Sequence, residues 1–284
     1  MTNHNLKFIF FGTPKVAIKT LDILKENGYF PVSIITSPDK QSGRGLIMKE
    51  TEVAIWAKDN NIKCYKPEKI TEDFIEEISK IGADLSIVVA YGKILPEKII
   101  KMPSLGTINI HYSLLPKWRG ASPLEASLLN GEEVTGISIQ QMEYKLDSGP
   151  ILAEEEIDIN IGDTKNEIRN KLINLGANCL CDLIPKIESK SIKPKIQDET
   201  KATFCKKIKK EDGQIDINGD QKEIWNKYRA FYGWPGIFFF IEKKARKIRI
   251  KITDATYENN SFIIKRVVPE GKKEISYEEF LRWN

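Results

Sequence analysis

The chain has 284 residues, of which 41% are hydrophobic and 30% are charged, and its formal net charge is +4. This is the composition of a soluble globular protein, and the length predicts two domains. No apolar run approaches the roughly 20 residues that span a membrane, and the first residues lack a signal-peptide pattern, so we expect a cytoplasmic protein.

The basic residues are unevenly distributed along the chain. Residues 204–284 contain 18 Lys or Arg against 12 Asp or Glu, whereas residues 1–203 contain 26 against 28. A basic tail on a near-neutral body favours a polyanionic partner, and the alternative is a solvated lysine-rich surface. The four cysteines form no C-x-x-C pair, which favours free thiols over disulfides or a zinc site.

The first half of the chain alternates strand and helix signals. Residues 6–11 predict a buried strand that stops at Gly12, and Thr13 is expected to cap a helix that runs from Pro14 to residue 27. Further strands are predicted at 32–36, 63–65, 84–90, 107–111 and 136–142, helices at 51–60 and 71–81, and a loop at 37–45. This order predicts an α/β fold with a doubly wound, mostly parallel sheet.

The second half changes character after a long helix predicted at 164–185. Residues 187–203 are polar and extended, which is typical of a linker. A helix is predicted at 221–231 and strands at 237–242, 246–253 and 261–267, and closely spaced strands indicate a small antiparallel barrel or sheet. We therefore expect a first domain at 1–188, a linker at 189–203 and a second domain at 204–284.

Two polar side chains interrupt a strand that should be apolar on both faces. Along residues 107–111, Ile108 and Ile110 point one way, and Asn109 and His111 point the other way. They lie near the carboxyl end of the strand, where open α/β sheets place their ligands, and histidine exchanges protons near neutral pH. The alternative is that both side chains cap buried backbone ends.

A third polar candidate, Asp147, lies in the turn at 144–149 between two predicted strands. Taken alone, a carboxylate in such a turn is typical of a turn former. The first strand ends in Gly-Thr-Pro rather than G-x-G-x-x-G, which argues against a dinucleotide cofactor. The chain also lacks a His/Cys cluster with zinc spacing, so we expect no metal.

Several stretches resemble the folate-dependent formyltransferases. They are Phe11–Pro14, Pro38–Gly45, Val89–Pro96, Asn109–Gly120, Leu146–Gly149, Gln197–Thr200 and Arg229–Gly236. Among these, Pro38–Gly45 and Arg229–Gly236 are most similar to the branch that formylates methionyl-tRNA. The resemblance implies a Rossmann-like formyltransferase domain followed by an OB-like β-barrel. Only three strong strand runs follow Trp234, so we expect a truncated barrel.

The resemblance also implies the roles of individual residues. Asn109, His111 and Asp147 would be catalytic. The folate pocket would be formed by Ser113, Leu114, Leu115, Pro116, Val89, Ala90, Tyr91, Gly92, Ile94 and Leu95. Contacts to tRNA are expected from Lys40, Gly43, Arg44 and Gly45, and from the basic run that holds Lys207, Lys209 and Lys210.

The implied reaction moves the formyl group of 10-formyltetrahydrofolate to the α-amine of initiator methionyl-tRNA, in a monomer and without a metal. Asn109 would hold the developing oxyanion, His111 would donate to it or take a proton from the amine, and Asp147 would orient His111. The sequence does not assign the individual proton steps.

Other functions remain open at this point. The same site would serve an N-formyltransferase acting on a nucleotide-linked amino sugar, and the fold would also serve an RNA-binding protein without catalysis. A further option is hydrolysis of the formyl-folate by water. The aromatic residues Trp225, Tyr228, Phe231 and Trp234 fit a base-stacking platform, but the helical spacing of the first three favours core packing.

Overall fold

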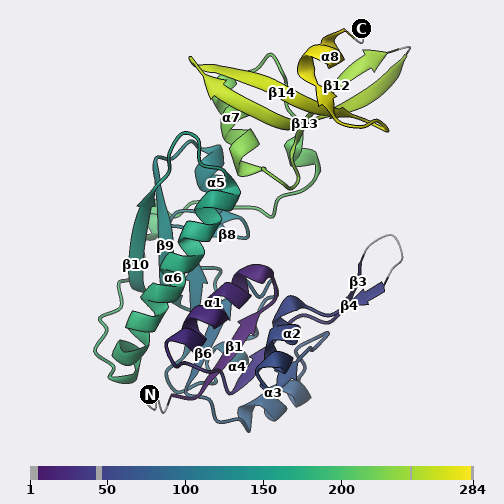
Figure 1. Ribbon diagram of the computed structural model, residues 1–284. Helices are drawn as coiled ribbons and strands as arrows, with labels where there is room; N and C mark the ends of the chain where they lie inside the picture. The colour runs from purple at the N-terminus through teal and green to yellow at the C-terminus, as the bar shows by residue number, and fades with distance from the viewer. Residues whose placement is uncertain (1–5, 43–46, 244, 283–284) are drawn as a thin grey trace. The chain divides into compact units, whose positions relative to one another are not determined.

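A computed structural model describes residues 6–42, 47–243 and 245–282 (Figure 1). The chain forms two compact units, and each unit is built from three separate stretches of the sequence. The first unit contains residues 1–119, 136–156 and 171–204, and the second contains residues 120–135, 157–170 and 205–284. The four cysteines are free thiols.

A seven-stranded sheet organises the first unit, in the order β10-β9-β7-β6-β1-β2-β5. Strands β7, β6, β1, β2 and β5 run parallel, and β9 is antiparallel to β7. The predicted mostly parallel α/β sheet is therefore confirmed. The strands are β1 (Phe8–Gly12), β2 (Ser33–Ile35), β5 (Cys64–Tyr65), β6 (Leu85–Val89), β7 (Thr107–His111), β9 (Val134–Gln141) and β10 (Ile151–Asp158).

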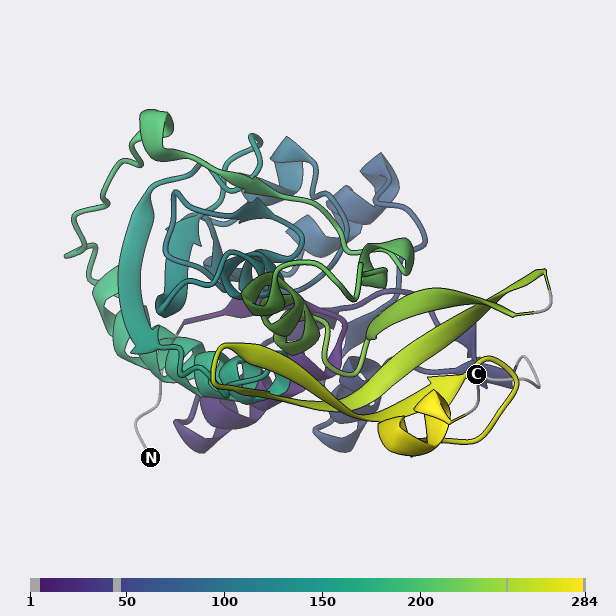
Figure 2. The ribbon, with the colours of Figure 1, turned by 90° about the horizontal axis from the view of Figure 1, so that it is seen from above.

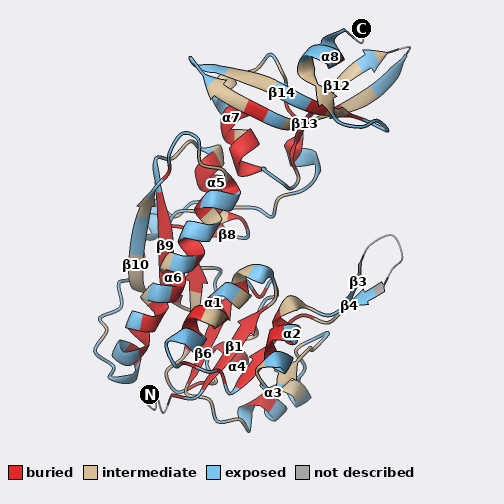
Figure 3. Ribbon diagram, in the orientation of Figure 1, coloured by how far each residue is buried: buried red, intermediate tan, exposed pale blue. Residues whose placement is uncertain are grey.

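Strands β1 and β6 are buried at every position, as parallel strands covered on both faces should be (Figure 3). Helices α1, α2, α3 and α6 lie where the periodicity predicts them, whereas the short α4 has no counterpart in the sequence prediction. Helix α1 packs against β6 and α2. The helices are α1 (Lys15–Glu26), α2 (Glu52–Asp59), α3 (Glu72–Ser79), the short α4 (Glu97–Ile100) and α6 (Lys165–Glu188).

Three local expectations need correction. The N-cap of α1 is Pro14 and no side chain caps the helix, because the hydroxyl of Thr13 donates instead to the carbonyl of Tyr91 at 3.1 Å. The predicted loop at 37–45 contains strand β3 (Lys40–Ser42), which pairs antiparallel with β4 (Ile47–Lys49). The predicted linker contains a 3₁₀ turn, η1 (Glu199–Lys201).

The second unit contains an antiparallel sheet in the order β12-β13-β14-β15, which confirms the antiparallel β domain (Figures 1 and 2). The predicted strand runs correspond to its first three strands. Its elements are α5 (Pro123–Leu129), η2 (Glu211–Gly213), α7 (Gln221–Ala230), β12 (Ile237–Lys243), β13 (Arg246–Glu258), β14 (Ser261–Pro269), β15 (Ile275–Ser276) and α8 (Tyr277–Leu281). Two short strands, β8 (Arg119–Gly120) and β11 (Phe204–Cys205), form a separate two-stranded sheet.

Helix α7 packs against α5 and β14, and its aromatic side chains contact Phe262 of β14. Trp225 stacks on Tyr228 and Tyr257, with ring centroids 5.3 and 5.9 Å apart. Trp225, Tyr228 and Phe231 are all buried, whereas Trp234 is 57% exposed. The first three residues therefore pack in the core of the second unit.

Candidate active site

Strand β7 carries the first two polar candidates on one of its faces. Asn109 is half-buried and His111 is buried. On the opposite face, Ile110 packs so closely against α6 that a Cβ on Gly176 would lie 2.9 Å from its Cγ2. Because α6 covers the apolar face of β7, the polar face is the one that remains for a site.

The two ring nitrogens of His111 face different neighbours. Its Nε2 lies 3.0 Å from the carbonyl oxygen of Trp118, and its Nδ1 lies 3.8 Å from Oδ2 of Asp147. A carbonyl oxygen only accepts hydrogen bonds, so Nε2 is the donor and carries the proton of the neutral ring. Nδ1 then presents a lone pair toward Asp147, across a gap too long for a direct hydrogen bond.

Burial is the main influence on the charge of this ring. Removal from water lowers the pKa of His111 below its ordinary value of 6.5, and the charge of Arg119 acts in the same direction. The carboxylate of Asp147 and the carbonyl of Trp118 act against this shift. His111 is therefore neutral at pH 7, with a carboxylate positioned to stabilise the imidazolium once a proton arrives.

Asp147 reaches His111 from the loop between β9 and β10. Its backbone adopts φ 46°, a left-handed conformation that is uncommon for a residue with a side chain. Its Oδ1 accepts a hydrogen bond of 2.8 Å from Nε2 of Gln140. Gln140 is the register partner of Asn109 on the neighbouring strand β9, so the carboxylate lies over the face that holds Asn109 and His111.

The loop closes tightly after Asp147. A Cβ on Gly149 would lie 1.8 Å from the carbonyl oxygen of Gln141, and Gln141 donates its amide hydrogen to the carbonyl of Pro150 at 2.9 Å. Only glycine permits this backbone approach. The three predicted catalytic side chains thus share one face at the carboxyl end of β7.

The loop after β7 holds the first set of predicted folate residues. The hydroxyl of Ser138 on β9 donates to the carbonyl of Ser113 at 2.8 Å and accepts from the amide of Leu115 at 2.9 Å. Ser113 and Leu115 are buried, whereas Leu114 and Pro116 are partly exposed. β9 therefore fixes the backbone of this loop and leaves two of its four side chains partly accessible.

The loop after β6 holds the second set. Val89, Tyr91 and Leu95 are buried, and the last two belong to a core cluster in which Tyr91 packs edge-on against Phe11. In contrast, Ala90 and Gly92 are exposed, and Ile94 is 86% exposed. The exposed positions of this loop are thus Ala90, Gly92 and Ile94.

The order of the strands reverses between β1 and β6. From β1 the chain proceeds outward through β2 and β5, and it then returns to β6 and continues to β7 on the other side. Gly12 and Val89 are register partners at the ends of these two strands, and Thr13 ties the loops that follow them. Such a reversal is where open α/β sheets bind their ligands.

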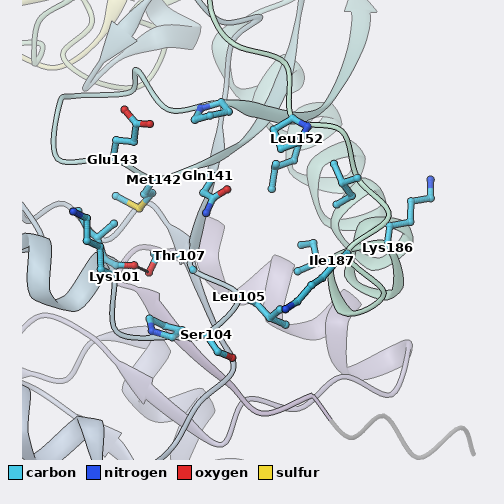
Figure 4. A pocket seen from close by; sticks show the side chains of 17 residues that line it. Lys101, Ser104, Leu105, Thr107, Gln141, Met142, Glu143, Leu152, Lys186 and Ile187 are labelled. Carbon is cyan, nitrogen blue, oxygen red and sulfur yellow. Dashed lines mark hydrogen bonds between the residues drawn. The ribbon is translucent and has the colours of Figure 1, made fainter.

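A pocket of about 590 Å³ opens at the other end of β7 (Figure 4). Thr107, Gln141 and Met142 lie near one another in its lining, and Lys186 and Ile187 of α6 line it from across the pocket. Its lining does not include Asn109, His111 or Asp147.

The chain matches two formyl transferase family models, the first over residues 5–184 and the C-terminal domain model over residues 207–265. It is 41% identical to the methionyl-tRNA formyltransferase of Sulfurihydrogenibium sp. (strain YO3AOP1) over 252 residues, which cover 88% of this chain and 80% of that protein. The chain belongs to the methionyl-tRNA formyltransferase family.

Solved structures of formyltransferases share the fold of this family member. The methionyl-tRNA formyltransferase from Clostridium thermocellum matches with a TM-score of 0.61 and 19% identity, covering 95% of this chain and 99% of that one. The N-formyltransferase from Helicobacter canadensis, in complex with folinic acid and dTDP-3-aminofucose, matches with a TM-score of 0.64 and 20% identity, covering 89% of each chain.

The residues predicted for tRNA lie in separate parts of this formyltransferase. Lys40 is exposed at the start of β3 in the first unit. Gly43, Arg44 and Gly45 lie outside the described residues. Lys207, Lys209 and Lys210 are exposed in the second unit.

Sequence reasoning missed a polar network beside the face of β7 that holds Asn109 and His111. Residues 197–203, here called the strap, hydrogen-bond to the loops that carry Asp147 and Trp118. Two members of this network, Arg119 and Gln197, lay in stretches that carried the family resemblance. The further signal for Gln197 was its place in a run of polar residues whose composition is typical of a linker.

Within residues 6–42, 47–243 and 245–282, no group of three or more His, Cys, Asp or Glu side chains is arranged to hold a metal ion. No helix in that part of the chain is long and apolar enough to cross a membrane.

Proposed function

We propose that this protein transfers the formyl group of 10-formyltetrahydrofolate to the α-amino group of initiator methionyl-tRNA. Membership of the family supports this reaction, because the relative with 41% identity is named methionyl-tRNA formyltransferase. The observation that carries the chemistry is the buried His111–Asp147 pair at the carboxyl end of β7.

The proposed reaction begins when the neutral amine attacks the formyl carbon bound to N10 of the folate. Negative charge then develops on the formyl oxygen, and the Asn109 amide donates a hydrogen bond to it. That amide is half-buried and makes no hydrogen bond to any residue that the structure describes, so it is available as a donor.

His111 is the proposed acceptor for the proton of the attacking amine. Its Nδ1 carries the lone pair because Nε2 donates to Trp118. The imidazolium formed in this step is paired with the carboxylate of Asp147. The same proton then moves to N10 as the C–N10 bond breaks, which leaves formyl-methionyl-tRNA and tetrahydrofolate.

We propose that the folate lies at the reversal point of the sheet, against the loops after β6 and β7. Support comes from the accessible surface at Ala90, Gly92 and Ile94 and from the fixed backbone of Ser113 and Leu115. The other predicted members of the pocket, Leu114, Pro116, Val89, Tyr91 and Leu95, belong to the same two loops. Of these, Val89, Tyr91 and Leu95 are buried, and their proposed role is to support the pocket from the core beneath it.

We further propose that residues 1–188 carry the catalysis, that residues 204–284 bind tRNA and that residues 189–203 join them in a monomer. Exposed Lys40 and the exposed lysines 207, 209 and 210 are the proposed phosphate contacts. The loop containing Gly43, Arg44 and Gly45 is proposed to approach the acceptor end.

The test is single-turnover formyl transfer from 10-formyltetrahydrofolate to methionyl-tRNA, with the wild type, Asn109→Ala and His111→Ala. We expect loss of the oxyanion donor to slow the step about 10²- to 10³-fold, and loss of the base about 10²- to 10⁴-fold. Circular dichroism and the melting temperature establish that both variants are folded. Near-wild-type rates in both folded variants would remove the mechanism.

The same assay separates the alternatives when a nucleotide-linked amino sugar replaces the tRNA. Transfer to the sugar alone would identify a sugar N-formyltransferase. Release of formate without transfer would identify a hydrolase, and tight tRNA binding without either reaction would identify a binding protein.

A further inference from the structure

Arg119 is a fully buried charged side chain, with no part of it exposed to solvent. Its Nε and Nη2 donate to Oε1 of Gln197 at 3.1 and 2.7 Å. Its Nη1 and Nη2 donate to the Glu199 carboxylate at 3.1 and 2.8 Å. Burial of a guanidinium is costly unless such hydrogen bonds satisfy it, so this arrangement is strongly specified.

The hydrogen bonds from Arg119 fix the orientation of the side-chain amide of Gln197. Because Arg119 occupies Oε1, the Nε2 group must point the other way. It donates to the carbonyl of Asp147 at 2.9 Å and to the carbonyl of Gly149 at 2.7 Å. The two carbonyls belong to the loop that carries the catalytic-face carboxylate.

The conformation of the loop that carries Asp147 requires stabilisation by residues outside the loop. Asp147 has the left-handed φ of 46°, which its own side chain disfavours. The Gln197 bonds bracket this residue and the following turn, and Gln140 holds the carboxylate itself. The backbone and the side chain of Asp147 are thus fixed from two different elements.

The strap also reaches the other side of His111. Thr203 accepts from the amide of Trp118 through its Oγ1 at 2.9 Å and from the amide of Arg119 through its carbonyl at 2.9 Å. The carbonyl of Trp118 is the acceptor for Nε2 of His111. One short segment therefore positions the partners of both nitrogens of the imidazole.

We propose that Gln197, oriented by Arg119, is a positioning residue that sets the approach of Asp147 to His111 and so tunes His111 as the proton acceptor. This rests on the proposed formyl transfer. Gln197 touches no reacting atom, and its effect passes through the carbonyls of Asp147 and Gly149.

The sharpest kinetic test is Gln197→Glu, because a carboxylate oxygen still accepts from Arg119 while both N–H donors are removed. We expect kcat to fall about 10- to 100-fold, since a small displacement of a catalytic group has effects of this size. The KM values for formyl-folate and for methionyl-tRNA should change less than about threefold, because the loop and not the binding surface is altered.

A matched control is Lys193→Gln. Lys193 lies four positions before Gln197 and is exposed. This variant removes a charge from the chain just before the strap without touching the Asp147 loop, so kcat and both KM values should remain those of the wild type. A kcat of Gln197→Glu within about twofold of the wild type would overturn the proposal.

A second readout needs neither substrate. The chain has two histidines, so a His4→Gln background leaves the His111 imidazole alone in a ¹⁵N NMR titration. Arg119 first and then Lys145 lower the pKa of Glu199 to about 2, so this part of the network stays ionised throughout the titration. The groups facing the ring are Asp147, Arg119 and the Trp118 carbonyl.

In the neutral variant Gln197→Met, the midpoint of His111 should fall below that of the wild type, because the carboxylate that favours the imidazolium is less well held. Lys193→Gln should titrate as the wild type does. If Gln197→Met fails to fold, the titration of Gln197→Glu serves instead, and its curve must differ from the wild type. An unchanged curve in the folded variant would overturn the proposal even if kcat fell.

The two proposals fail separately. A wild type without formyl transfer, but with a His111 midpoint that responds to position 197, would reject the proposed function and keep the coupling between Gln197 and the imidazole. A wild type that transfers formyl groups, with an unaltered Gln197→Glu variant, would reject the positioning role alone.

Discussion

His111 combines two interactions that act on different ring nitrogens. The Trp118 carbonyl fixes the proton on Nε2, and this leaves the lone pair of Nδ1 beside Asp147. Burial keeps the ring neutral, and the nearby carboxylate stabilises the ring when it is charged. A general base needs both properties, since it must be unprotonated before the reaction and must be stabilised once it has accepted the proton.

The first residue-scale prediction concerns acid stability. The folded pKa of His111 lies below 6.5, so the unfolded chain binds more protons in the pH range just below that value. The stability of the wild type therefore falls as the pH falls through this range, by up to about 1.4 kcal/mol for each pH unit. His111→Gln should lack this contribution, as measured by urea unfolding at about pH 7.5 and about pH 5.5. Equal pH dependence in both proteins would contradict the assignment.

The second residue-scale prediction concerns Gly149. In Gly149→Ala the new Cβ would collide with the carbonyl oxygen of Gln141, so the loop that carries Asp147 must shift. We expect the free energy of unfolding to fall by about 2 kcal/mol or more, and formyl transfer to slow. Gly162→Ala is the matched control, because no atom lies within 4 Å of its added Cβ, and its stability should change by less than about 0.5 kcal/mol. Equal unfolding midpoints in the two variants would rule out the clash.

At the scale of elements, strand order and strand ends decide where the site lies. Strand β7 ends next to β6, whose following loop is tied to the end of β1 by Thr13. Strand β9 supplies Gln140 and Ser138, which hold the Asp147 loop and the loop after β7. The antiparallel strand β9, which lies between β10 and β7, thus supports both loops of the site.

Helix α7 offers an element-scale prediction in the second unit. The Asp220 carboxylate caps this helix by accepting from the amide of Glu223 at 2.8 Å. Asp220→Ala should destabilise the protein by about 1 kcal/mol, whereas Asp220→Ser should retain most of the stability because serine also caps. The unfolding midpoint measures both variants. A midpoint as low in the serine variant as in the alanine variant would exclude capping as the cause.

The sequence predicts the parallel strands because their apolar runs are continuous and bounded by glycine and proline. The same logic predicts that Asn109 and His111 share a face, since alternation along a strand is a local property. The approach of Asp147 to His111 could not be predicted from the strand pattern, because it depends on the register of β9 against β7. Nor could the strap, since its bonds join residues about 50 to 80 positions apart in the chain.

At the scale of the whole molecule, the uneven charge gives a prediction about tRNA. The excess of basic over acidic residues lies in residues 204–284, and Lys207, Lys209 and Lys210 are exposed there. In the wild type, the KM for methionyl-tRNA should rise steeply with salt. In Lys207→Gln/Lys209→Gln/Lys210→Gln, the salt slope should fall by about 1 for each lysine that no longer neutralises a phosphate.

The control for this experiment is Lys15→Gln/Lys19→Gln/Lys80→Gln, which removes the same charge from exposed positions of the first unit. Its salt slope should remain that of the wild type, and the KM for formyl-folate should be unaffected in both triple variants. An equal reduction of the salt slope in the two triple variants would mean that net charge, and not a local interaction, attracts the tRNA.

The hydrogen bonds of the strap limit how far the catalytic centre can be reduced. A chain cut back to residues 1–188 would still encode Asn109, His111 and Asp147, yet it would lack Gln197 and Thr203, which hold the two neighbours of the imidazole. The smallest portable form of this centre therefore extends to residue 203. Grafting the three side chains onto another scaffold without that segment would reproduce their identities but not their spacing.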